Sequence, residues 1–340
     1  MKQLFIIFLS VFTISCQSQN KLKLEELETI PGLYSTIVLQ NDTVAFRKFY
    51  NGKDDDTYFH IHSETKSIMA LLIGIAIDKG YIKNVDQFIS DFYPVILDDT
   101  SMLKKQITIR HLLNQNSGLA AIEWPNAMCD QWLNSPNPSL FLLSLPMDAV
   151  PGSKYSYSTP ASHLLSGIIT KASGMETAYF ADKYLLNPLG ITDHKWVKLR
   201  DGFYDGGGTA VQFKTDDMLK IARLILNKGT HKGKVLISQK YLEQVFSKDK
   251  KIKAPWGLKN SNYNFCWYTT EYESYEVRYA IGYGGQFIFI IPALNTAIAV
   301  NHDTRVSNPN RQSDVFLEKS FPVIFKKVLA ASGRRTSEGE

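Results

Sequence analysis

The 340-residue sequence contains only three cysteines, Cys16, Cys129 and Cys266. So few cysteines exclude a small fold held together mainly by disulfides, and no Cys/His cluster has the spacing of a zinc site. We therefore expect neither a metal nor another cofactor. Whether Cys129 and Cys266 pair depends on a proximity that the sequence does not reveal.

Long apolar runs and dense charge are missing as well. The N-terminal apolar run, Leu4–Ile14, is too short to span a bilayer. The net charge of +5 is spread along the chain, and its one dense basic run, Lys248–Lys253, is typical of a solvated loop. These features argue against a nucleic-acid partner.

The start of the chain has the pattern of an export signal. Ser15 and Cys16 follow the apolar run, where a signal peptidase expects a small residue. Thr13–Cys16 resembles a bacterial lipobox, with Thr13 in place of the usual leucine. We therefore expect lipidation at Cys16 and a bacterial lipoprotein of the periplasm or cell envelope, held to a membrane by its lipid. The alternative is an ordinary signal peptide cleaved near Ser18.

The remaining chain predicts β structure at both ends. Gly32–Gln40 and Thr43–Tyr50 flank an Asn-Asp turn and predict a hairpin. The later β-rich runs are 265–269, 277–281, 286–291 and 296–301. The predicted helices are 107–113, 138–144, 163–173, 176–186, 215–226 and 322–331.

This order predicts an α+β fold, in which one antiparallel sheet is closed by the two ends of the chain and flanked by helices. A helical lobe is inserted into it. We assign residues 1–15 to a signal peptide, 16–24 to a lipidated tether and 332–340 to a disordered tail. Within the domain 25–331, the expected sheet lobe is 25–80 with 205–331, and the helical lobe is 81–204.

The most informative motif is Ser63-Glu64-Thr65-Lys66, which begins the apolar segment Ser67–Ile77. Helical residues three apart share one face, so the hydroxyl and the amine would be neighbours. A serine hydroxyl needs a nearby base, and a half-buried lysine with a lowered pKa can supply it. The same spacing occurs elsewhere in the chain, but only here does it open an apolar helix. The alternative is that Ser63 only caps this helix.

Two later segments could complete a catalytic site. The Pro-Gly-led loop 151–159 carries Tyr155 and Tyr157, and Tyr157 near a lysine could act as a general base. Ala280–Gln286 has glycines that allow a substrate to approach and leave N–H groups for an oxyanion. The alternatives are half-buried loop aromatics and a glycine-rich bulge.

Together these segments resemble the penicillin-recognising serine hydrolases, which include β-lactamases, D,D-peptidases and related esterases. Ile107–Leu119 resembles the family's "ITIRHLL…SGL" segment, and Leu185–Asp193 its "PLGMTD" segment. Asp205–Arg223 resembles its "GGL…T..DLA.F" segment. The resemblance runs from about residue 32 to residue 300 and implies a β-lactamase/transpeptidase-like fold.

The resemblance also implies roles for residues. Ser63 would be the acylated nucleophile, Lys66 its activating partner, and Tyr157 the base and acid of the second motif. The backbone N–H groups of Ser63 and Tyr283 would form the oxyanion hole. Apart from the resemblance, the residues expected to contact the substrate are Trp124, Tyr155, Thr159, Gly282 and Gly284. For the aromatic residues the alternative is ordinary packing.

Two departures from the family pattern bear on specificity. The second motif of class C β-lactamases is Tyr-x-Asn, and its third position here is Thr159. The Lys-Thr-Gly motif is replaced by Ala280-Ile281-Gly282, without the lysine that grips a substrate carboxylate. These versions more closely resemble the branch that contains 6-aminohexanoate-dimer hydrolase and related carboxylesterases.

We therefore predict an exported serine hydrolase that cleaves small-molecule esters or amides through an acyl-enzyme on Ser63. One alternative is a D-amino-acid peptidase or weak β-lactamase that acts on cell-wall-type substrates. Another is an inactive binder of envelope peptides.

Overall fold

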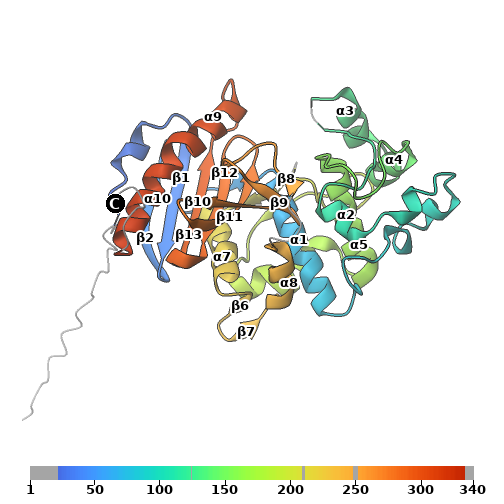
Figure 1. Ribbon diagram of the computed structural model, residues 1–340, viewed down its shortest axis with the longest axis horizontal. Helices are drawn as coiled ribbons and strands as arrows, with labels where there is room; N and C mark the ends of the chain where they lie inside the picture. Colours follow the sequence, from blue (N-terminus) through green and yellow to red (C-terminus); the bar gives the residue numbers. More distant parts are fainter. Residues whose placement is uncertain (1–21, 124, 209–210, 248–251, 334–340) are drawn as a thin grey trace, which may run out of the picture.

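The computed structural model describes residues 22–123, 125–208, 211–247 and 252–333. Its centre is an eight-stranded antiparallel sheet with the strand order β2-β1-β13-β12-β11-β10-β9-β8 (Figure 1). The strands are β1 (Leu33–Gln40), β2 (Thr43–Phe49), β8 (Ile252–Lys253), β9 (Asn262–Asn264), β10 (Trp267–Tyr272), β11 (Tyr275–Gly282), β12 (Gln286–Ile291) and β13 (Thr296–His302). The predicted signal peptide and Cys16 lie outside the described residues.

The two ends of the chain meet in the middle of this sheet. Strand β1 pairs with β13 in antiparallel register, with Val38 opposite Ile298. Every residue of β12 and β13 is buried, because both faces of the sheet are covered at this point. On one face, Phe287 and Phe289 pack against Phe316 and Phe321. The predicted α+β fold, with a sheet closed by the two termini, is confirmed.

Two groups of helices can be distinguished in Figure 1. One group, α2 to α5, gathers in a lobe beyond α1, and α9 and α10 pack against the sheet. The helices are α1 (Glu64–Asp78), α2 (Ile109–Leu113), α3 (Ala127–Asn134), α4 (Pro138–Ser144), α5 (Thr159–Ser173), α6 (Thr177–Ala181), α7 (Thr215–Leu226), α8 (Gln239–Val245), α9 (Pro309–Val315) and α10 (Phe321–Ala331). Smaller sheets are formed by β3 (Phe59–His60), β5 (Val211–Phe213) and β4 (Lys195–Trp196), and by β6 (Thr230–His231) and β7 (Lys234–Val235).

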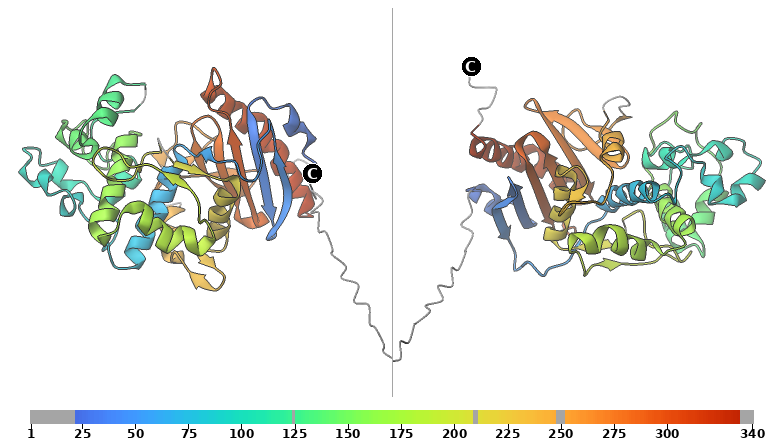
Figure 2. Two further views of the ribbon diagram at one scale, coloured as in Figure 1. Left: turned by 180° about the vertical axis from the view of Figure 1, so that it is seen from behind. Right: turned by 90° about the horizontal axis from the view of Figure 1, so that it is seen from below.

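Helix α1 is the central helix of the molecule. All residues from Glu64 to Ala76 are buried, as expected for a helix that is apolar on every side. Gly74 admits the ring of Tyr241, since a Cβ there would lie 2.3 Å from that ring. Figure 2 (right) shows α1, in light blue, running between the sheet and the helical lobe. Its first residues therefore sit where the two lobes meet.

Several predicted boundaries differ from the observed ones. Helix α5 begins at Thr159 rather than at residue 163, because the Ser158 side chain accepts a hydrogen bond from the backbone of Ala161 and so caps the helix. Helix α2 begins two residues later than predicted, because Thr108 and His111 form a reciprocal cap. The predicted helix 176–186 is α6 followed by a wider helical turn, Asp182–Leu186.

The folded domain is longer than predicted at both ends. Leu22 and Leu24 are buried, and the Leu22 N–H donates to the carbonyl of Ala45 at 3.0 Å. The predicted tether therefore does not extend to residue 24. At the other end, the N–H of Ser332 still bonds to the last turn of α10, so the predicted tail does not start at 332.

The two cysteines within the described residues are not joined in a disulfide. Cys266 is buried and donates to the carbonyl of Leu113 at 3.3 Å, whereas Cys129 is partly exposed. Burial raises the pKa of the Cys266 thiol to about 12, so it stays protonated. Across the described ranges, no helix is long and apolar enough to cross a bilayer. The same ranges hold no cluster of three or more His, Cys, Asp or Glu side chains that could bind a metal ion.

Candidate active site

Ser63 occupies the turn that joins β3 to α1. His62, just before it, has a left-handed backbone with φ +48°, which turns the chain into the helix. Ser63 is partly exposed at the N-cap position of α1, but its side chain makes no capping hydrogen bond. Capping alone therefore does not explain this serine. The helix N-terminus beneath it favours negative charge on the hydroxyl oxygen.

Lys66 is hydrogen-bonded to Ser63. Its Nζ donates to Ser63 Oγ at 3.1 Å, to Thr159 Oγ1 at 2.9 Å, and to the carbonyl of Gly207. The side chain is only 1% exposed. Burial lowers the pKa of Lys66, which increases the fraction of the neutral amine that can accept a proton, although the carboxylates of Glu123 and Asp205 oppose this shift.

Tyr157 covers the same lysine from another side. The Lys66 Nζ lies 4.8 Å from the centroid of the Tyr157 ring, and the Tyr157 and Ser63 side chains are hydrogen-bonded. Burial raises the pKa of the Tyr157 phenol, and the bond to Ser63 only partly offsets this rise. The phenol is therefore neutral at rest and available as a proton donor.

Thr159 faces the lysine and is held from behind by Glu123. Thr159 is only 6% exposed, and its hydroxyl donates to Glu123 Oε1 at 3.1 Å. The backbone N–H of Thr159 donates to Glu123 Oε2 at 2.6 Å. Predicted as a substrate contact, Thr159 has its hydroxyl engaged by Lys66 and Glu123. Sequence reasoning missed Glu123, which lies 36 residues away and belongs to no recognisable motif.

The turn Asp205–Gly208 supplies the carbonyl that binds Lys66. The buried Asp205 carboxylate accepts from the N–H groups of Gly207 (2.8 Å) and Gly208 (3.0 Å), which fixes the turn. A Cβ on Gly207 would lie 2.4 Å from Thr159 Cγ2. A Cβ on Gly208, whose φ is +101°, would lie 2.1 Å from the carbonyl oxygen of His62. The glycines therefore allow this turn to pack directly against the segment that carries Ser63.

The end of β11 approaches Ser63 from the sheet. A Cβ on Gly282 would lie 2.2 Å from the carbonyl oxygen of Ile61, so only glycine permits this approach. The next residue, Tyr283, places its ring 5.8 Å from that of His62 and is 37% exposed. Gly284 instead packs toward Thr304, because a Cβ there would lie 2.8 Å from Thr304 Cγ2. The structure thus brings Gly282 and Tyr283, but not Gly284, against the turn that carries Ser63.

Two aromatic residues near the site differ from expectation. Tyr155 is half-buried, with its ring 5.4 Å from that of Tyr263, and its hydroxyl has no hydrogen-bond partner among the described residues. Trp256, which sequence reasoning missed, is 43% exposed and contacts the Tyr157 ring edge-on at 5.0 Å. The only signal for it was a Pro-Trp-Gly loop. Trp124 lies outside the described residues.

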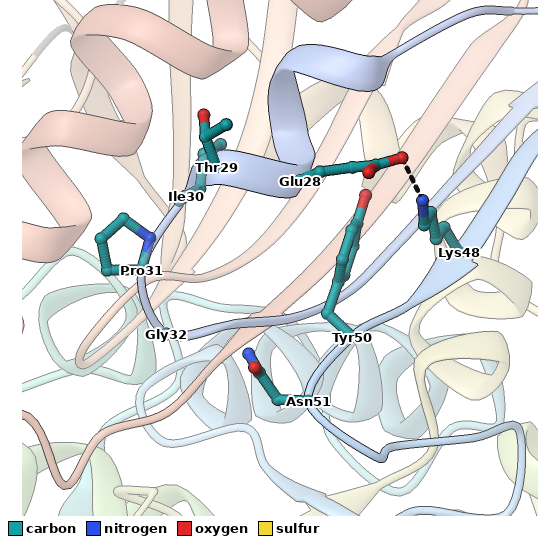
Figure 3. Close-up of a pocket in the computed structure, with 8 residues that line it drawn as sticks. All are labelled: Glu28, Thr29, Ile30, Pro31, Gly32, Lys48, Tyr50 and Asn51. Carbon is teal, nitrogen blue, oxygen red and sulfur yellow. Dashed lines mark hydrogen bonds and ion pairs between the residues drawn. The ribbon is translucent and has the colours of Figure 1, made fainter.

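Two surface cavities lie away from these residues. The larger, of about 430 Å³, is on the sheet lobe, where Glu28 and Lys48 form an ion pair above Tyr50 (Figure 3). The smaller, of about 310 Å³, is lined by residues of β9 to β11 with Phe246. Ser63, Lys66 and Tyr157 line neither cavity. The candidate site is therefore defined by its side-chain chemistry.

Comparisons with known proteins bear on the family and the fold of the chain. The family described as Beta-lactamase matches residues 22–320. No curated protein sequence shows significant similarity to the chain. Among solved structures, one described as a putative 6-aminohexanoate-dimer hydrolase from Bacillus anthracis superposes with a TM-score of 0.73 at 17% identity, covering 89% of this chain and 82% of that one.

Two further structures share the fold. A D-stereospecific amidohydrolase from Streptomyces sp. gives a TM-score of 0.66 at 14% identity, covering 88% of this chain and 97% of that one. A class C β-lactamase from Rhodobacter sphaeroides gives 0.63 at 16% identity, covering 88% and 96% of the two chains. At these identities the likeness shows the fold alone.

Proposed function

Because the chain belongs to the beta-lactamase family of serine hydrolases, we propose that it cleaves small neutral esters or amides through an acyl-enzyme on Ser63. The observation that carries this proposal is the bond of 3.1 Å between Ser63 Oγ and the Nζ of a fully buried lysine. Burial lowers the pKa of Lys66, so the amine can accept the serine proton as the hydroxyl attacks.

The proposed acylation step follows from these contacts. Ser63 Oγ bonds to the substrate carbonyl carbon while its proton passes to Lys66 Nζ, and the carbonyl π electrons move onto oxygen. That oxyanion would be bound by the N–H groups of Ser63 and Tyr283. When it collapses, the bond to the alkoxide or amine breaks and the leaving group takes a proton.

Tyr157 is the proposed donor of that proton. Burial raises the pKa of its phenol, which favours the neutral form as a donor over the phenolate as a base. The proton on Lys66 can then return to the Tyr157 oxygen, which leaves both groups as they began. Attack by water on the acyl-enzyme releases the acid and regenerates Ser63.

The end of β11 supports a preference for neutral substrates. Where related enzymes carry Lys-Thr-Gly, this chain has Ala280, which is buried, and the partly buried Ile281. A carboxylate-bearing substrate would therefore lose a charge-assisted hydrogen bond that typically contributes about 1.5–3 kcal/mol. A lipid at Cys16 is our further proposal for how such an enzyme is held at the cell envelope.

The test compares two substrates on one preparation of the purified protein. We expect kcat/KM for nitrophenyl butyrate to exceed that for nitrocefin by at least about tenfold, from the lost hydrogen bond. If nitrocefin or a D-alanyl dipeptide is the better substrate, the β-lactamase or D-peptidase alternative replaces this proposal. Absence of labelling by a fluorophosphonate probe would leave the inactive binder as the explanation.

A further inference from the structure

Glu123 is hydrogen-bonded to Thr159, whose hydroxyl also binds the catalytic lysine, Lys66. Both of its carboxylate oxygens are used on Thr159, one by the backbone N–H and one by the hydroxyl. Thr159 in turn accepts from Lys66. Building on the proposed function, we infer that Glu123 is a positioning residue, which acts through Thr159 to aim the nitrogen of Lys66 at Ser63.

The hydrogen-bond directions around Lys66 are fixed by chemistry. The carbonyl oxygen of Gly207 can only accept, so one N–H of Lys66 must point to it. The carboxylate of Glu123 also can only accept, so the single hydroxyl proton of Thr159 is committed to it. The Thr159 oxygen is then left as an acceptor, and a second N–H of Lys66 must point there.

The third position on the Lys66 nitrogen faces Ser63 Oγ at 3.1 Å. In the ammonium form this position holds the third N–H. In the neutral amine it holds the lone pair, because the two other positions are occupied by obligatory N–H donors. The lone pair is thus directed at the proton that must be removed. Without the carboxylate, the Thr159 hydroxyl can donate to the same lone pair and compete with Ser63.

Glu123 also affects the charge of Lys66. Its carboxylate raises the pKa of Lys66 against the lowering by burial, and the carboxylate of Asp205 acts in the same direction. The other titratable groups that interact with Lys66 are the phenol of Tyr157, the imidazole of His62, and the thiols of Cys129 and Cys266. Glu123 is hydrogen-bonded to the side chain of Thr159, which binds the lysine, whereas Asp205 accepts from the backbone N–H groups of Gly207 and Gly208.

Glu123→Gln tests the inference with little change in size. The Thr159 N–H will hold the amide oxygen, so the amide NH₂ faces the Thr159 hydroxyl and forces it to turn toward Lys66. We expect the plateau kcat/KM for nitrophenyl butyrate to fall about 10- to 100-fold, as when a partner that orients a metal ligand is removed. Loss of the charge lowers the pKa of Lys66, so the acid-side midpoint of the pH profile should move to lower pH.

Controls separate positioning from folding. Asp130→Asn removes one charge from an exposed site on α3 and should leave rate and midpoint unchanged. A midpoint that moves while the plateau stays at the wild-type value would mean that Glu123 acts on Lys66 through its charge alone, and that result would overturn the inference. Turnover that survives Ser63→Ala would instead overturn the proposed function itself.

A double-mutant cycle tests the route through Thr159. In a Thr159→Val background, which lacks the hydroxyl, adding Glu123→Gln should cost less than about twofold, since the connection is already broken. The same loss in both backgrounds would mean that Glu123 does not act through Thr159. If Glu123→Gln does not fold, Thr159→Val alone decides: it should show the 10- to 100-fold loss, and wild-type turnover would overturn the inference.

Discussion

The surroundings of Ser63 differ on its two sides, with a buried polar network on one side and exposed aromatic rings on the other. On the inner side, Lys66 and Thr159 are buried, and each polar atom named there is held by at least one hydrogen bond. On the outer side, Tyr283 and Trp256 are 37% and 43% exposed and offer mainly aromatic surface. A buried hydrogen-bond network of this kind holds its side chains in one arrangement, whereas exposed rings tolerate substitution. The inner side should therefore control the rate of the chemistry, and the outer side the choice of substrate.

Removing the hydroxyl between the two sides should have the largest effect. Ser63→Ala is expected to abolish both turnover and fluorophosphonate labelling. It should change stability by less than about 1 kcal/mol, because the side chain makes no capping hydrogen bond that could be lost. Thermal unfolding of the variant provides the control, and esterase activity near that of the wild type would place the nucleophile elsewhere.

The inner side is tested by Lys66→Ala and Tyr157→Phe. Each should slow acylation by at least about a hundredfold, the usual scale for general acid–base help. The double variant should lose far less than the product of the two factors, because both residues serve one proton path. Losses that multiply fully in pre-steady-state acylation rates would show two independent roles.

The packing beneath the nucleophile is tested by Gly208→Ala. The added methyl would meet the carbonyl of His62 and shift the turn that carries Ser63, so we expect kcat to fall about a hundredfold. Gly202→Ala is a matched control, since Gly202 also has a positive φ (+82°) but open space around its Cβ position. Equal losses in the two variants would assign the effect to backbone strain alone.

The outer side should give the smallest effect. Trp256→Ala removes an edge-on ring contact with Tyr157, worth about 0.5–1.5 kcal/mol, together with part of the exposed aromatic surface. We expect KM for aromatic esters to rise about two- to tenfold, with little change in kcat. Trp256→Phe keeps a ring but loses the hydrogen bond of 2.7 Å from Trp256 Nε1 to the Tyr268 hydroxyl. Its KM should lie between those of the wild type and Trp256→Ala. A change mainly in kcat would place Trp256 in the chemistry.

Much of the fold could be predicted because its pattern is local. Helix α7 matches its predicted range, 215–226, and the β1–β2 hairpin forms around the predicted turn. The short strands β3, β4 and β5, of two or three residues, carry no such pattern and exist only through their mutual pairing. The sequence pattern predicts helix α5 four residues short, because it places the capping serine, Ser158, in the loop 151–159.

The candidate site divides in the same way. Ser63 and Lys66 share one turn of a helix, so their spacing alone predicts the contact that the structure shows. Glu123 meets Thr159 only because α5 and the loop before α3 are folded together, and one glutamate among many has no signature of its own. Trp256 likewise reaches Tyr157 from the loop between β8 and β9. Contacts between segments that are distant in the sequence can be identified only once the fold is known.

Strand β1 emerges early in synthesis but cannot be joined to β13 until almost the entire chain is available. Helix α1 also depends on residues made much later. The Ser67 hydroxyl donates to the carbonyl of Cys266, and the indole N–H of Trp267 donates to the carbonyl of Ser67. Pairing over such sequence distances makes folding slow, because the entropy of loop closure is lost before the stabilising contacts can form. The unpaired edges meanwhile stay open to other chains. Deleting β13 should therefore prevent α1 from packing in its native position, although every residue of α1 would still be present.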